Sequence, residues 1–259
     1  MLNRSCVVLL SFLAVATVAL PASAQNSNVG EFSLLFSTPD PNLRLQSGTL
    51  TSATGITEID FVEEFDIDKK TFPEIRFSAG RRHKFRFGYL PVRYEADAII
   101  ERTITFRGQT FTIGAPASTD IDWDIWRFGY EWDFVSRDRG FVGIIGELKY
   151  NHLTASIDSP ALARAAATEQ KAPIPAVGVI GRGYLTPYAF VSAEFSGLKW
   201  EREDWDATFW DFDVNGAVTF GRYIGVQGGY RSVTVDYFID DDIGDLKLQG
   251  PYIGVIAKF

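Results

Sequence analysis

The sequence predicts an all-β fold: a transmembrane, antiparallel up-and-down β-barrel of about ten strands that extend above the membrane. Three observations support this prediction. Apolar and polar residues alternate with period two along most of the chain, the alternating segments are long, and tight turns alternate with longer loops. Period-two alternation is typical of strands, and short turns on one side with long loops on the other are typical of a membrane barrel. Eight and twelve strands are the alternative counts.

The composition of the 259 residues limits the class of protein. Hydrophobic residues make up 46%, aromatic residues 14% and charged residues 22%. This apolar fraction excludes a disordered chain. The net charge of −8 disfavours a nucleic-acid-binding protein, which needs a basic face. The single cysteine excludes a disulfide framework and a thiolate metal cluster, and we expect no metal site and no cofactor.

Residues 1–24 have the order of a secretory signal peptide. Arg4 precedes the apolar run 7–20, and Ala22 and Ala24 form a small-residue cleavage site. The run is shorter than the ~20 apolar residues of a membrane-spanning helix. We therefore predict an exported protein with a signal peptide at 1–24 and one barrel domain at 25–259.

The clearest predicted strand is 208–220. One face carries Trp210, Phe212 and Val214, and the other carries Asp211 and Asp213. The same pattern predicts nine further strands along the chain. The predicted up-strands are one from about Val29, 84–101, 140–157, 188–200 and 222–238; the down-strands are one ending at Gly80, 118–135, 173–184, 208–220 and 246–259.

Short turns at 80–83, 136–140, 185–187 and 221–222 fit a count of ten strands. Segment 38–72 is ambiguous. Its parts 43–50 and 56–65 are read either as outer extensions of strands one and two or as a further hairpin that would make twelve; we favour ten.

One segment has helical rather than strand character. Ser159 and Pro160 precede an Ala-rich stretch at 161–169, which predicts one short surface helix.

Four of the predicted strands change their apolar parity part-way. In 118–135 the apolar positions pass from Trp123 and Ile125 to Trp126 and Phe128. A one-residue bulge would produce each switch. Since each switch lies about 8–10 residues from a short turn or from the last residue, close to the ~9–11 residues of a membrane-spanning strand, we infer that the outer half of each strand stands above the membrane.

Parity also predicts which charged side chains face the lumen. Their mixed signs favour a salt-bridged plug, with a small polar pore or a ligand pocket as the alternative. The predicted lumen residues are Glu74, Arg76, Lys84, Arg86, Arg127, Glu131, Asp133, Glu147, Lys149, Glu194, Asp211, Asp213, Arg231 and Lys258, continued above the membrane by Arg93, Glu95, Asp97, Asp120, Asp122 and Asp124.

The outer loops are acidic, with Glu63, Glu64, Asp66 and Asp68 in one and runs at 201–206 and 240–242 in two others. Divalent cations are one hypothesis for this rim, because they prefer oxygen ligands. A solvated rim is the simpler interpretation.

Catalytic patterns are weak in this sequence. His152 lies near Ser156 on one strand face, and a His–Ser pair is the basis for an alternative reading as a lipid-modifying enzyme. We expect no enzyme activity.

The last residues carry a resemblance to a known group. Ile253, Val255 and Phe259 share one face and end on a terminal Phe, a pattern similar to the C-terminal assembly signal of bacterial outer-membrane barrel proteins. With the signal peptide and the cysteine-free remainder, the chain resembles the OmpA/OmpX/OmpW-like group of small barrels. The resemblance implies a location in the outer membrane of a Gram-negative type of envelope, with membrane lipid, lipopolysaccharide and the barrel-assembly machinery as partners.

We therefore expect an integral outer-membrane protein that either passes small solutes or has a structural or surface-contact role. A lipid-modifying enzyme is the alternative, and a soluble periplasmic β-protein is a further one.

Overall fold

The computed structural model describes residues 29–46, 58–202, 205–239 and 242–259. Its elements are β1 (Gly30–Ser37), β2 (Asp40–Gln46), β3 (Ile59–Asp60), α2 (Phe61–Phe65), β4 (Phe72–Gly80), β5 (His83–Ile99), β6 (Ile104–Phe106), β7 (Gln109–Phe111), β8 (Pro116–Arg137), β9 (Gly140–Ser159), a 3₁₀ helix η2 (Pro160–Leu162), β10 (Arg164–Thr186), β11 (Ala189–Arg202), β12 (Trp205–Phe220), β13 (Ile224–Ile239) and β14 (Asp242–Lys258). In these four ranges no helix is long and apolar enough to cross a membrane. The predicted signal peptide lies outside them and stays a prediction.

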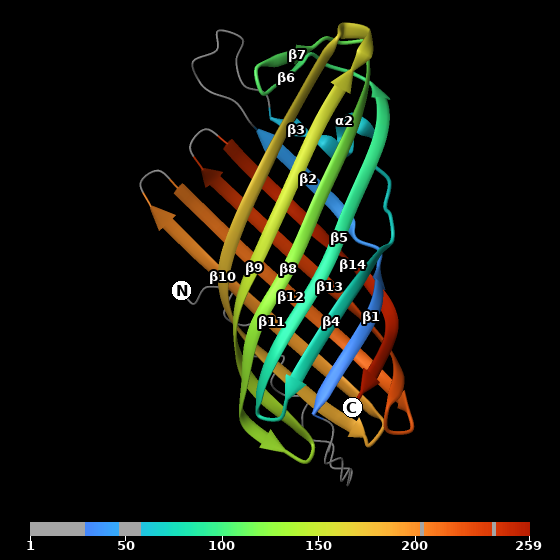
Figure 1. Cartoon of the computed structure of the whole chain (residues 1–259), viewed down its shortest axis with the longest axis vertical. Helices are drawn as coiled ribbons and strands as arrows, with labels where there is room; N and C mark the ends of the chain where they lie inside the picture. Colours follow the sequence, from blue (N-terminus) through green and yellow to red (C-terminus); the bar gives the residue numbers. More distant parts are fainter. Residues whose placement is uncertain (1–28, 47–57, 203–204, 240–241) are drawn as a thin grey trace, which may run out of the picture.

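Ten antiparallel strands close into a barrel (Figure 1). Their order around the wall is β1-β4-β5-β8-β9-β10-β11-β12-β13-β14, and pairing of β1 with β14 closes the ring. Four tight turns, β4–β5, β8–β9, β10–β11 and β12–β13, lie at one end, shown at the bottom of Figure 1. In bacterial barrels the short turns face the periplasm, so we name this end periplasmic and the opposite end outer. The all-β fold and the count of ten are confirmed.

The segment 38–72 departs in part from the expectation. β2 continues the first strand, because its residues Asp40–Gln46 pair with β14 beyond β1. Residues 43–46 are thus an outer extension, as expected. Residues 56–65 do not extend strand two: the described part forms the two-residue β3 and the helix α2, whose start Asp60 caps by accepting bonds from the Val62 and Glu63 amides. The twelve-strand alternative is wrong.

The prediction of a helix at 161–169 is also wrong. Only Pro160–Leu162 form a short 3₁₀ turn, and β10 begins at Arg164. The Ala-rich stretch pairs with β9, for example Ala166 with Ile157, and buries Ala166 and Thr168 alternately. Pairing and burial on one face therefore override the helix propensity of alanine.

The parity switches do not arise from bulges. Pairing of β8 with β5 runs without interruption from Pro116 to Trp132, and its pairing with β9 is continuous from Ser118 to Trp132. Its only register shift lies near the periplasmic turn, between Trp132 and Val135. The same residues of β8, the odd-numbered ones, face inward on both sides of the switch. What changes is the chemistry of the two faces.

Toward the periplasmic end the barrel has an apolar outer surface. On β8, Phe128, Tyr130 and Trp132 point outward and are 43–49% exposed, while Arg127 and Glu131 at the alternate positions are buried. Similar outward apolar side chains on the other strands form a continuous band around the wall, for example Leu148, Val179, Phe195, Phe212, Val226 and Val255. An apolar band outside with polar residues inside is the pattern of a transmembrane barrel.

Toward the outer end the pattern reverses. On β8, Ile121, Trp123 and Ile125 are buried, and Asp122 and Asp124 occupy the outer face. The strands β5, β8, β9 and β10 continue well beyond the others, with 17, 22, 20 and 23 residues (Figure 1). This extension has a polar outer face and an apolar inner one, as a sheet in water does.

The inner face of the extension is covered by a hydrophobic cluster that we name the upper core. Its members come from both sides of the barrel and from the cap formed by β2, β3, α2 and the β6–β7 hairpin. They include Leu43, Leu45, Ile59, Phe61 and Phe65 of the cap, Phe106 and Phe111 of the hairpin, Tyr94, Trp123 and Leu153 of the extension, and Phe209, Val233 and Leu246 of the facing wall.

Candidate functional site: the barrel interior

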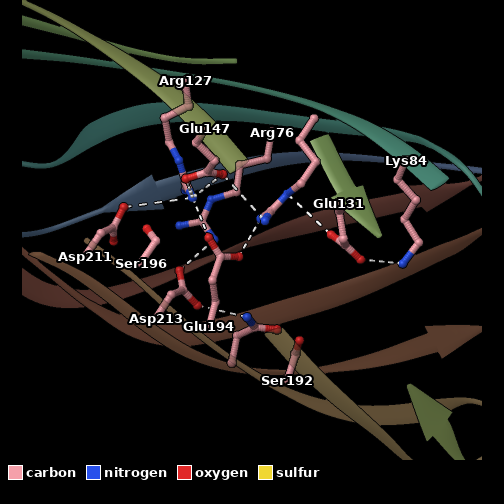
Figure 2. Close-up of polar contacts among 12 residues, drawn as sticks. Arg76, Lys84, Arg127, Glu131, Glu147, Ser192, Glu194, Ser196, Asp211 and Asp213 are labelled. Carbon is pink, nitrogen blue, oxygen red and sulfur yellow. Dashed lines mark hydrogen bonds and ion pairs between the residues drawn. The ribbon is translucent and has the colours of Figure 1, made fainter. Parts of the chain in front are cut away.

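A network of buried charges lies in the barrel interior, and Figure 2 shows part of it. We name it the charged network. It joins six cationic and seven acidic side chains from seven strands: Arg76, Lys84, Arg86, Arg127, Lys149 and Arg231 with Glu74, Glu131, Asp133, Glu147, Glu194, Asp211 and Asp213. Each strand contributes at alternate positions, because only every second residue of a strand faces inward.

Lys149 lies where the charged network borders the upper core. It is 0% exposed; its ammonium is 2.6 Å from Asp211 Oδ2, 3.3 Å from Glu147 Oε2 and 2.9 Å from Ser196 Oγ. It also lies 4.4 Å from the centre of the Phe209 ring, which belongs to the upper core. The charged network and the upper core are therefore in direct contact.

Arg127 and Arg231 each connect acids of two different strands. Arg127 on β8 contacts Glu147 on β9 at 3.2 Å and Glu194 on β11 at 2.5 Å. Arg231 on β13 contacts Asp211 on β12 and Glu74 on β4, both at 2.8 Å. A guanidinium group has five donors in a fixed plane, so one arginine can satisfy two carboxylates at once.

Arg76 and Lys84 extend the network toward the periplasmic end. Arg76 contacts Glu74 and Asp213, each at 2.7 Å. Asp213 also accepts a bond from the Tyr252 hydroxyl at 2.7 Å. Lys84 contacts Glu131 at 2.5 Å and Asp133 at 2.7 Å. Buried charges are tolerated when they are paired, and every member of the charged network lies within 4 Å of a group of opposite sign.

A second, smaller cluster was not identified from the sequence. Arg182 of β10 contacts Glu31 of β1 at 2.6 Å, and Lys258 of β14 lies 3.8 Å from the same carboxylate. Of these three, only Lys258 was expected in the lumen. Glu31 could have been predicted to face the lumen, because Glu31 and Ser33 alternate with the apolar Phe32 and Leu34. Arg182 could not, because the glycines on both sides of it conceal the alternation of the strand.

The structure places all fourteen charged residues expected within the membrane in the lumen. The six expected above it do not face the lumen. Arg93, Glu95, Asp97, Asp120, Asp122 and Asp124 lie on the outer face of β5 and β8, where Arg93 pairs with Asp122 and Asp124 at 2.7 and 2.8 Å. The expectation was wrong because it applied a bulge that the register does not contain; without it, the inward positions above the membrane are apolar.

A cavity of about 540 Å³ lies between the charged network and the periplasmic end. Arg76, Arg86, Arg127, Glu147 and Glu194 of the network line its inner part. The turns β4–β5 and β8–β9 line its mouth with Arg81, Arg82, Ser136, Arg137 and Asp138. The charged network and the upper core lie on the outer side of the cavity.

The remaining candidates are not assembled into sites. His152 Nε2 donates a hydrogen bond to the Glu169 carboxylate at 2.9 Å on the outer face. Ser156 lies four residues along the same strand, about 13 Å away at the usual rise. His152 and Ser156 therefore form no dyad. In the described ranges no group of three or more His, Cys, Asp or Glu residues could hold a metal ion. Among the residues of the acidic outer loops, the Glu64 carboxylate pairs with Arg102 at 3.1 Å. Residues 203–204 and 240–241 of the two other acidic loops lie outside the described residues.

The C-terminal residues close the barrel seam. Ile253, Val255 and Phe259 are 50–67% exposed on the lipid-facing side. The Phe259 ring stacks on the Phe77 ring. The backbone oxygen of Phe259 accepts hydrogen bonds from the Val29 and Gly30 amides at 2.7 and 2.8 Å.

Comparison with known proteins places the fold. No family model matches the chain, and no curated protein matches its sequence. Among solved structures, the chain is similar to the outer membrane protease OmpT from Escherichia coli, with a TM-score of 0.59 and 8% identity over 94% of this chain and 100% of that one. The chain has the fold of an integral outer-membrane β-barrel.

Two further barrels match less closely. Ail, the attachment invasion locus protein of Yersinia pestis, has a TM-score of 0.38 and 10% identity over 89% of this chain and 99% of that one. The toluene transporter TodX of Pseudomonas putida has a TM-score of 0.35 and 8% identity over 92% of each chain.

Proposed function

We propose that this chain is a closed outer-membrane barrel with a structural or surface-contact role, and that it does not pass solutes. The observation that carries the proposal is the filling of the lumen at two successive levels, by the charged network and by the upper core. In a narrow barrel side chains occupy the interior, whereas open channels belong to much wider barrels.

The two levels resist solutes in different ways. In the charged network the carboxylates are already bound by arginine and lysine, so a passing ion would have to displace buried ion pairs. The upper core is made almost entirely of apolar groups, so an ion that enters it would lose its water and gain little in return. Both levels include residues of opposite walls, for example Trp123 facing the β12–β14 side, where Phe209 and Leu246 lie.

The outer extension supports the surface-contact part of the proposal. On β10 alone, thirteen residues from Arg164 to Ala176 lie beyond the pairing with β11, about 40 Å at the rise of a strand. The outer face of the extension carries exposed charges on β5 and β10, for example Glu95, Asp97, Glu169 and Lys171. A polar sheet of this length would present contacts outside the lipid.

The partners follow from the same surfaces. The apolar band would be surrounded by outer-membrane lipid and, in the outer leaflet, by lipopolysaccharide. The exposed row Ile253, Val255 and Phe259 would be read by the barrel-assembly machinery before the seam closes. Divalent cations at the acidic loops stay a hypothesis.

The lipid-modifying enzyme is the weaker candidate. His152 is paired with Glu169, and Ser156 donates to the Asp120 carbonyl at 3.4 Å, so neither is arranged for nucleophilic attack. The likeness to a protease concerns the fold and transfers no catalytic residue to this chain.

Single-channel recording in planar lipid bilayers tests the proposal. We expect no conductance steps above the lipid background with the purified, folded protein. The double variant Arg127→Ala/Glu194→Ala, which opens the charged network alone, should also stay silent because the upper core is intact. Regular conductance steps from the wild-type protein would overturn the closed-barrel proposal.

A further inference from the structure

We propose that the periplasmic cavity binds a small soluble anion that carries two or more phosphate or carboxylate groups. This goes beyond the proposed closed barrel, because it assigns a ligand to the side of the network that solutes can still reach. The residues that would contact the anion are Arg81, Arg82 and Arg137 at the mouth of the cavity.

The size and shape of the cavity suit a small ligand. Its volume of about 540 Å³ lies within the ~300–1,000 Å³ of small-molecule sites. The inner end is lined by Arg86 and Arg127, both bound to Glu194. A ligand would therefore enter and leave from the periplasm only.

The charges deep in the cavity are already neutralised. Lys84 is paired with Glu131 and Asp133, and Arg182 with Glu31. At the mouth the situation differs: within the part of the chain that the structure describes, Arg81, Arg82 and Arg137 make no ion pair. Asp138 is the only acid beside them in the two turns that line the mouth. The free charge of the cavity is therefore positive and lies at its entrance.

The three arginines come from adjacent hairpins that are held in place. β5 and β8 are neighbours, with His83 opposite Trp132. The β4–β5 turn is fixed at both ends, because the Gly80 amide donates to the Val29 carbonyl at 2.6 Å and the Asp133 amide donates to the Arg82 carbonyl at 2.8 Å. The β8–β9 turn is also held, because Arg137 pairs with Gly140 and Ser136 with Phe141 beyond the register shift between Trp132 and Val135.

The local charge contrasts with the charge of the chain. The net charge is −8, so the molecule as a whole repels small anions. Three exposed arginines at the entrance of this cavity reverse the field locally and concentrate anions there. Guanidinium groups bind phosphate and carboxylate through two parallel hydrogen bonds, which favours a ligand with several such oxygens.

Isothermal titration calorimetry on the folded full chain in neutral detergent tests the proposal, with inorganic pyrophosphate and citrate as probes. We expect saturable binding of one ion per chain. Arg81→Ala/Arg82→Ala/Arg137→Ala should weaken it at least about tenfold, because three charge-assisted contacts are lost. Arg139→Ala/Arg222→Ala is the matched control: both arginines lie in turns at this end but do not line the cavity, and the affinity should change less than twofold.

Three outcomes would overturn the proposal. The first is the absence of saturable binding to the wild-type chain. The second is an equal loss of affinity in the control variant, which would show a general effect of charge. The third concerns the source of the anion: in nanodiscs, pyrophosphate should bind equally well in neutral and in anionic lipid, and its displacement by anionic lipid would assign the arginines to a lipid headgroup. None of these outcomes depends on conductance, so this proposal and the closed barrel fail separately.

Discussion

At the residue scale, the buried charges hold the two barrel walls together. Lys149 is the most enclosed of them, with contacts to Glu147, Ser196 and Asp211 and no exposed surface. A charge in this position is stabilised only by its partners, and those partners depend equally on it. Removing one member therefore leaves a buried charge that is less well compensated.

We predict that Lys149→Met lowers the free energy of unfolding by about 3 kcal/mol, the lower end of the range for breaking a buried pair, because Arg231 still contacts Asp211. Urea unfolding in lipid vesicles would measure it. The control is Lys171→Met, which removes an exposed ion pair with Glu169 and should have a much smaller effect. Equal effects of the two substitutions would contradict the role given to burial.

The sequence predicted the lumen residues within the membrane because a strand has only two faces, and one of them was apolar. Asp211 and Asp213 alternate with Trp210 and Phe212, so the aspartates had to face inward. The partners could not be predicted. Arg231 contacts Glu74 across 157 positions, and such a contact depends on barrel closure, which alternation along one strand does not encode.

At the element scale, the strands exchange the chemistry of their faces where they leave the membrane. On β8 the inward side chain changes from Arg127 to Ile125, and the outward one from Phe128 to Asp124, with no change in register. Parity alone led to the wrong faces for Arg93 and Asp122, because a chemical exchange and a bulge give the same sequence pattern. Only the pairing of β8 with its neighbours distinguishes the two.

The outer parts of β13 and β14 carry a pair of facing acids. Asp236 lies opposite Asp245, and partial burial together with Asp245 raises the pKa of Asp236 above its ordinary value. The ionised form is therefore unfavourable in the folded state, and the folded state gains stability as the pH falls through this pKa. The pKa of Glu169 is shifted in the opposite direction, because hydrogen bonds from Lys171 and His152 lower it. The ionised carboxylate therefore stabilises the folded state, and this stabilisation is lost as the pH falls.

We predict that Asp236→Asn raises the unfolding midpoint in urea at pH 7 to 8 and that this gain disappears as the pH approaches 4. Glu169→Gln should lower the midpoint at pH 7, again with a difference that vanishes in acid. Urea unfolding of the two variants and the wild type at several pH values would measure this. Shifts of the same sign in both variants would contradict the assignment.

At the scale of the whole molecule, one wall serves two solvents. The band of Phe128, Tyr130 and Trp132 faces lipid, and the same strand continues into water with Asp122 and Asp124 outside and Trp123 inside. The interior follows the same division, with the charged network in the membrane part and the upper core above it. This arrangement explains why the average composition of the chain resembles that of a soluble protein.

The strand count was predictable from four short turns, and residues 43–46 were expected to extend the first strand, but the rest of the cap was not predictable. β2 extends the barrel wall beyond β1 by pairing with β14. The helix α2 packs Phe61 and Phe65 into a core whose other members lie on distant strands. Segments of this kind gain their structure from tertiary contacts rather than from a local pattern.

The outer face of β8 passes from lipid to water along one continuous strand. A spin-label scan of outward positions on β8, from Asp120 to Phe134 in a variant with Cys6→Ser, measures this passage by accessibility to oxygen and to a water-soluble nickel complex. We predict that oxygen reaches labels at 128, 130 and 132, that the nickel complex reaches labels at 120, 122 and 124, and that the change falls near Trp126. Access of the nickel complex to all of these positions would show that the lower part of β8 does not face lipid.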